Sequence, residues 1–145
     1  MNVSHNLIVL DTNLIVSALI SPKGAASQAL VIALNYFNIA CSREVLAELV
    51  DVIKRDKFDK YASKAIRAEM LATYAQAVLL FEITERVTDC QDPKDNKFLE
   101  LALSSGSKLI VSGDKRDLLV MNPYRGIEII GLRSFIDNHQ QYRVP

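Results

Sequence analysis

The sequence is poor in the residues on which several classes of functional site depend. It has two cysteines, two histidines and five glycines in 145 residues. Two cysteines do not form the disulfide framework of a small secreted domain, and they point to a reduced, cytoplasmic chain. His5 and His139 lie far apart near the two ends of the sequence, so neither a zinc site nor a Ser-His-Asp triad is indicated. The glycines form neither a Walker loop nor a Gly-x-Gly-x-x-Gly turn.

Net charge and long apolar runs are also missing. Seventeen basic and seventeen acidic residues cancel to a formal charge of zero, so any nucleic acid would have to be bound by a local patch. The first residues carry no basic stretch, and no secretory signal is expected. The most apolar window, 25–41, is interrupted by polar residues. It predicts a buried helix running into a strand rather than a membrane span.

What is present is an alternation of short apolar runs with longer helical patterns, and we expect a single domain over residues 1–145. The apolar runs predict strands at 7–10, 38–41, 79–83, 108–112 and 127–130. The helical patterns cover 25–37, 43–54, 63–78, 95–105 and 132–138. The first of these is apolar nearly all round, so we expect it to be covered on most sides. Strands of continuous apolar residues that alternate with helices are typical of an α/β fold with a mostly parallel sheet.

Acidic residues stand where such a fold places its functional groups, beyond the carboxyl ends of the strands. Asp11 directly follows the first predicted strand, and Asp114 follows the fourth. Asp95 opens a predicted helix, and Glu48 lies at the edge of the apolar stripe of another helix. These four side chains are therefore candidates for one shared site.

Helix capping offers a competing explanation for some of these residues. Asp92 precedes a proline and has the pattern of an N-cap, with Asp95 three residues later as in a capping box. Asp114 and Asp117 repeat this spacing. Asp11 is harder to explain in this way. A carboxylate that ends a buried apolar strand has little access to water and needs a partner.

Convergence of the four carboxylates would favour a divalent cation between them. Two like charges 4 Å apart repel by roughly 4 kcal/mol at an effective dielectric constant of 20. Without a cation, some of the carboxylates would take up protons. An all-oxygen set of ligands selects a hard ion, so Mg²⁺ or Mn²⁺ is a better candidate than zinc.

Four stretches of the sequence resemble motifs of the PIN-domain family and occur in the family's order. They are Leu-Ile-Val-Leu-Asp-Thr-Asn at 7–13, Ser-Arg-Glu-Val-Leu-Ala-Glu-Leu at 42–49, Asp-Pro-Lys-Asp-Asn-Lys-Phe-Leu-Glu-Leu-Ala at 92–102 and Val-Ser-Gly-Asp at 111–114. The likeness is closest to the branch of toxin components of bacterial type II toxin–antitoxin systems. It implies a three-layer α/β/α fold with a mostly parallel five-stranded sheet, and a metal-dependent ribonuclease.

The resemblance also implies roles for individual residues. It makes the catalytic and metal-binding set Asp11, Glu48, Asp95 and Asp114, with supporting polar residues Thr12, Asn13 and Ser112. Asp92 and Asp117 are possible further acids. Members of this branch often place the next acid two positions after the one that matches Asp114. This chain has Asp117 three positions after it, so Asp114 is favoured over Asp117 as a ligand.

Basic residues beside these acids predict contacts with the substrate. Lys94 and Lys97 flank Asp95, while Lys115 and Arg116 follow Asp114. Contacts from such residues to phosphates position a nucleic-acid strand without reading its sequence. The competing interpretation is that they are ordinary solvated charges on the surface.

The sequence therefore predicts a Mg²⁺- or Mn²⁺-dependent endoribonuclease that hydrolyses RNA phosphodiester bonds. By the resemblance, we also expect a homodimer and an antitoxin protein as partner, with no membrane involved. A Mg²⁺-dependent phosphatase-like enzyme is one alternative, but its pattern needs an aspartate where this chain has Asn13. The other alternative is a catalytically weak PIN-like module that binds RNA or protein. Such a module would not explain why carboxylates are clustered, which is unfavourable without a metal ion.

Overall fold

The computed structural model describes residues 6–113 and 115–143, and within them the chain forms one five-stranded sheet. All strand pairs are parallel, in the order β3-β2-β1-β4-β5. The strands are β1 (Leu7–Leu10), β2 (Asn38–Cys41), β3 (Leu79–Leu80), β4 (Leu109–Ser112) and β5 (Glu128–Gly131). The predicted α/β fold with a parallel sheet is confirmed. The chain leaves β1 first towards β2 and later returns to β4, so the topological switch lies between β1 and β4.

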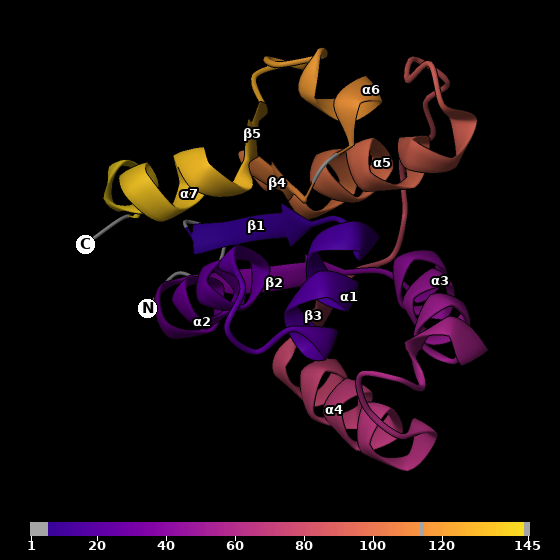
Figure 1. The fold of residues 1–145 in the computed structure, drawn as a ribbon. Helices are drawn as coiled ribbons and strands as arrows, with labels where there is room; N and C mark the ends of the chain where they lie inside the picture. Colours follow the sequence, from indigo (N-terminus) through magenta and orange to yellow (C-terminus); the bar gives the residue numbers. More distant parts are fainter. Residues whose placement is uncertain (1–5, 114, 144–145) are drawn as a thin grey trace.

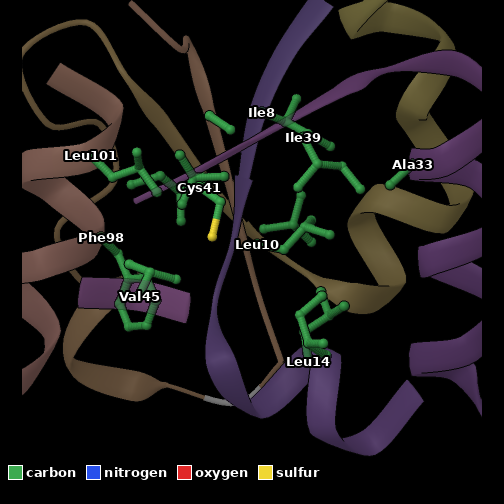
Figure 2. Close-up of a cluster of buried hydrophobic side chains, with 14 of the residues drawn as sticks. Ile8, Leu10, Leu14, Ala33, Ile39, Cys41, Val45, Phe98 and Leu101 are labelled. Carbon is green, nitrogen blue, oxygen red and sulfur yellow. The ribbon is translucent and has the colours of Figure 1, made fainter. Parts of the chain in front are cut away.

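Helices cover both faces of this sheet and its carboxyl end. They are α1 (Thr12–Ile20), α2 (Ala25–Tyr36), α3 (Arg43–Ile53), α4 (Lys64–Ala77), α5 (Asn96–Ser105), α6 (Arg116–Leu119) and α7 (Leu132–Asn138). One face packs on α5, and the other on α1, α2 and α7. Figure 2 shows this core from within, with Phe98 and Leu101 of α5 on one side of the strands and Ala33 of α2 on the other.

The position of α3 matters most for the site. It contacts both α1 and α5, which belong to opposite layers, and so it lies at the end of the sheet towards which β1 points (Figure 1). Its start is fixed by the predicted N-cap Ser42, whose hydroxyl accepts a hydrogen bond from the Val45 N–H at 3.1 Å. Val45, Leu49 and Ile53 are buried, and Glu48 lies at the edge of this buried stripe, from which its side chain reaches the sheet end.

The first two helices differ from the sequence-based expectation. The helix α1 was not predicted, because a short apolar run with several β-branched residues cannot be assigned to a helix or a strand by periodicity. The helix α2 was expected to be covered on most sides, but Val31 and Leu34 are 53% and 46% exposed. Among the described residues, no single helix has the length and apolar character needed to cross a membrane. The pair α1 and α2 meets those two criteria together, with a bend of 107° between its members.

The edge strand β3 is shorter than predicted. Its two residues pair only with the end of β2, and Leu80 is 58% exposed. The strand ends where β2 ends, because an edge strand has no second neighbour to extend its pairing. The short helix α6, like α1, was not predicted, and the remaining strands and helices agree with the predicted ranges to within one or two residues.

Candidate active site

Asp11 lies at the junction between β1 and α1 and is fully buried. Its carboxylate accepts hydrogen bonds from the Leu14 N–H at 2.9 Å, which caps α1, and from the Ser112 hydroxyl at 2.5 Å. The Gly113 N–H lies 3.0 and 3.2 Å from its two oxygens. Burial raises the pKa of Asp11, and these hydrogen bonds oppose the rise because they stabilise the charged form. The partners that this buried carboxylate needs come from the end of β4 and the first turn of α1.

Glycine at position 113 permits the close approach of β4 to α1. A Cβ on Gly113 would lie 2.9 Å from the backbone nitrogen of Leu14 and 3.1 Å from its Cα. Because both are backbone atoms, a larger residue would force the strand end away from α1 and lengthen the hydrogen bond to Asp11. Ser112 also accepts a hydrogen bond from the Lys115 N–H at 3.0 Å. The segment that follows β4 is thus tied to Asp11 through Ser112, one of the predicted supporting residues.

Glu48 reaches the same region from α3, and both of its carboxylate oxygens have partners. The Thr12 hydroxyl, at the start of α1, donates a short hydrogen bond to Oε1. The Lys97 ammonium, at the start of α5, lies 2.5 Å from Oε2. The side chains of Lys97 and Glu48 are 12% and 27% exposed, so this ion pair is largely shielded from water. One helix from each layer therefore contributes a donor to Glu48.

Asp95 is the least satisfied of the described acids. It is buried, and its Oδ2 accepts no hydrogen bond from any residue that the structure describes. Its Oδ1 lies 3.9 Å from the ammonium of Lys115. Burial raises the pKa of Asp95 to about 6; Lys115 opposes the rise, whereas Asp92, Asp11 and Glu48 add to it. The charges of Asp11 and Glu48 therefore act on Asp95, as expected for carboxylates at the same end of the sheet.

The predicted capping box is only half formed. The Asp92 carboxylate accepts a hydrogen bond from the Lys94 N–H at 3.0 Å and caps a short 3-10 helix (Pro93–Asp95), which agrees with its predicted N-cap role. Asp95 makes no side-chain cap. A carboxylate at this position usually returns to the cap residue, but here it is turned into the buried site instead. The second half of the capping prediction was wrong for that reason.

The predicted fourth acid, Asp114, lies outside the described residues. Among residues 6–113 and 115–143, no group of three His, Cys, Asp or Glu side chains is arranged to hold a metal ion. The chemistry of the donors nevertheless fits a hard cation. Asp95 has a buried oxygen without a partner, all the acids supply oxygen, and each carboxylate has about four lone-pair positions, so Asp11 can accept a further contact. Asp11, Glu48 and Asp95 are the described residues that would hold such an ion.

A cavity of about 730 Å³ opens beside these acids. Its walls come from α1, from α3 and the 3-10 helix that follows it (Asp56–Phe58), and from the 3-10 helix Pro93–Asp95 with the start of α5. Gly113 and Lys115, which follow β4, and the first residue of α7 complete them. Thr12, Glu48 and Gly113 lie on its wall, while Asp11 and Asp95 are buried beside it. The exposed Asn13 also lines the cavity. Asp117 does not, and its backbone carbonyl accepts a hydrogen bond from the thiol of Cys90.

Most of the predicted substrate-binding residues line this cavity. Lys94, Lys97 and Lys115 do so, whereas the exposed Arg116 does not. The structure adds Arg55 and Lys57, which reach the cavity from beyond the end of α3. Their place in the sequence does not single them out, because a charge-rich stretch between two helices is ordinarily a solvated turn. The signal that identifies them is spatial and comes from the packing of α3 across the sheet end.

Comparisons with known proteins agree with this arrangement. The family model of the PIN domain matches residues 7–116, a range that includes all four predicted acids. An uncharacterized protein of Methanocaldococcus jannaschii is 28% identical over 149 aligned residues, which cover 93% of this chain and 92% of that protein. Among solved structures, a chain from the crystal structure of VapBC2 from Rickettsia felis, bound to a DNA fragment from their promoter, is similar with a TM-score of 0.61.

The structural match has 15% sequence identity and covers 86% of this chain and 98% of the Rickettsia chain. At that identity it shows a shared fold and no more. The family model, in contrast, covers most of the chain and contains the strand ends, the start of α3 and the start of α5 from which the site is built. The chain therefore belongs to the PIN-domain family.

Proposed function

We propose that this chain is a Mg²⁺- or Mn²⁺-dependent endoribonuclease. The observation that carries the proposal is the buried Asp95, whose unpartnered oxygen lies in one site with Asp11 and Glu48 at the topological switch of the sheet. Burial of a carboxylate without a partner costs free energy, and a bound cation would offset that cost. The adjoining cavity with basic walls supplies room for a nucleic-acid strand.

In this proposal some side chains would hold the metal ion and others would position them. Asp11, Asp95 and Glu48, together with Asp114, hold the metal ion, and Thr12 and Ser112 keep Glu48 and Asp11 in position. A bound divalent ion supplies a Lewis acid that lowers the pKa of a water molecule and neutralises negative charge on the phosphate. The hydrogen bonds to Asp11 matter here because they fix its oxygens before the substrate arrives, which avoids reorganisation during the reaction.

The test is a cleavage assay with the purified chain and a fluorescently labelled single-stranded RNA. We expect cleavage with Mg²⁺ or Mn²⁺, none with excess EDTA, and recovery when Mn²⁺ is added back. Cleavage that is indifferent to EDTA would contradict a metal-dependent mechanism. A chain that is folded and binds RNA but does not cut it in either metal would support the weak module, which the engagement of both Glu48 oxygens by protein donors favours.

We further propose that the RNA strand continues from the acids towards Arg55 and Lys57. These residues line the same cavity as Glu48, and among the described residues the Arg55 side chain forms an exposed ion pair only with Asp51, at 3.6 Å. Such a pair contributes little and is readily exchanged for a phosphate. The basic residues that contact the RNA would then extend from Lys94 and Lys115 to Arg55 and Lys57, beyond the end of α3.

Replacing Arg55 and Lys57 together by alanine should weaken RNA binding about tenfold at low salt. Each lost phosphate contact should also reduce the slope of log affinity against log salt by about 0.7. Fluorescence anisotropy in EDTA measures both quantities without cleavage. The matched control is Lys60→Ala with Arg133→Ala, which removes two exposed charges from outside the cavity wall. Equal weakening of RNA binding in both double variants would show a general charge effect and contradict the proposed path of the RNA.

The biological role proposed is that of the toxin in a toxin–antitoxin pair acting in the cytoplasm. The Rickettsia structure with the similar fold is named as a VapBC2 complex, which supports an antitoxin protein as partner, and we also propose a homodimer. A phosphatase-like activity is disfavoured by the family match, since that alternative had only the strand-end aspartates in its support.

A further inference from the structure

The described acids differ in how readily they can accept a cation. Asp95 has a buried oxygen with no hydrogen-bond partner among the described residues. Glu48 has a partner on each oxygen, because Thr12 donates to Oε1 and the Lys97 ammonium lies 2.5 Å from Oε2. A divalent ion could therefore contact Asp95 without disturbing any hydrogen bond of the described residues. At Oε2 of Glu48 it would meet the positive charge of Lys97, and the repulsion between the two cations favours departure of the ammonium.

Lys97 is placed to change partners within the site. It is the second residue of α5, its side chain is 12% exposed, and it lines the same cavity as Lys94 and Lys115. Its four-carbon stem can move the ammonium by several ångströms while the backbone stays in the helix. A metal ion beside Glu48 would also repel the ammonium, because like charges close together in a shielded site interact strongly. The displaced ammonium would then face the cavity that we assign to RNA.

We propose, on the basis of the proposed nuclease function, that the Lys97 ammonium has two alternative partners in the site, Glu48 and the RNA substrate. It neutralises Glu48 until a divalent ion replaces it, and it then binds a phosphate group of the RNA substrate. Lys97 thus weakens metal binding and strengthens substrate binding. These opposite effects separate it from a residue that only stabilises the fold, whose loss would weaken both.

The direct test measures Mn²⁺ binding to the whole chain by electron paramagnetic resonance. Lys97→Met keeps the length of the side chain and removes its charge, and Lys97→Gln serves as a second variant with a polar end. Both should bind Mn²⁺ about tenfold more tightly than the parent chain. The matched control is Lys94→Met, because Lys94 lines the same cavity but its ammonium makes no ion pair with any described residue. It should change Mn²⁺ affinity less than twofold.

Two further measurements show whether Lys97 acts through Glu48. In a Glu48→Gln background, Lys97→Met should no longer tighten Mn²⁺ binding, because the partner charge has gone. In steady-state cleavage, Lys97→Met should lower the Mn²⁺ concentration needed for half-maximal rate and raise the KM for RNA about fivefold. Thermal melting of each variant in EDTA identifies any that fail to fold, and a folded variant is then used.

The outcomes separate this inference from the proposed function. Unchanged Mn²⁺ affinity in both Lys97 variants, or equal tightening in Lys94→Met, overturns the partner exchange and leaves EDTA-sensitive cleavage intact. If the parent chain and all variants fail to bind Mn²⁺, both the partner exchange and the metal-dependent nuclease are overturned. Tightening that is confined to position 97 and requires Glu48 supports the exchange.

Discussion

Asp11→Asn should reduce the rate of RNA cleavage by about 10³-fold or more, which is the scale of losing a preorganised electrostatic group at a reaction centre. The change removes the charge that would hold a divalent ion at the end of β1. It preserves the size and planar shape of the side chain, so the expected defect is chemical and not a cavity.

The fold should survive this change because an asparagine can keep each hydrogen bond. Its amide oxygen can accept from the N–H groups of Leu14 and Gly113, and its amide nitrogen can donate to the Ser112 oxygen in place of accepting from it. Loss of a buried carboxylate with a raised pKa also removes a cost of desolvation.

Initial rates in Mn²⁺, circular dichroism and growth after induced expression in a bacterium test this prediction together. The parent chain should arrest growth if it is a toxin, and Asp11→Asn should not. The control is Asp137→Asn, which removes an exposed carboxylate on α7 whose ion-pair partner among the described residues is Arg133, at 4.0 Å. Parental cleavage by a well-folded Asp11→Asn variant would show that the reaction does not depend on this site.

Asp95→Asn should make the protein more stable near neutral pH while it also abolishes cleavage. Burial raises the pKa of Asp95 to about 6, compared with about 3.9 in an unfolded chain. Between these values the folded state binds more protons than the unfolded state, so the contribution of Asp95 to stability falls as pH rises from 4 to 6. Above pH 6 its ionisation costs on the order of 2 kcal/mol, which the asparagine avoids in part. Its own amide remains poorly partnered.

Thermal melts in EDTA from pH 4 to pH 8 measure this effect. The melting temperatures of the parent chain and Asp95→Asn should agree near pH 4 and differ by about 5 °C in favour of the variant at pH 7.5. Added Mn²⁺ should reverse the order, because a ligand that binds only the folded state raises the melting temperature of the chain that can hold it. A difference that does not depend on pH would contradict a raised pKa at Asp95.

The sequence predicted the sheet well because its central strands, such as β1 and β4, are buried on both faces. Continuous apolar runs such as 7–10 and 109–112 leave few alternatives, and Asp11 follows the first of them directly. Prediction failed where local patterns were ambiguous. The helix α1 follows β1 without a turn, and its apolar residues fit either a helix or a strand. The helix α2 looked apolar on all sides, but only its small residues and Leu30 are buried.

Local pattern by itself determined which acids stand at strand and helix ends, since chain order and periodicity fix those positions. It also determined the family, because the motifs are runs of adjacent residues. Only the tertiary structure decided the partners of each carboxylate. The Asp95 carboxylate makes no capping hydrogen bond and lies in a buried site. Lys97 pairs with Glu48, which is 49 positions away in the sequence, and Arg55 lines the cavity. These pairings depend on how α3 and α5 pack over the end of the sheet, and contacts between distant segments leave no trace in the pattern of either one.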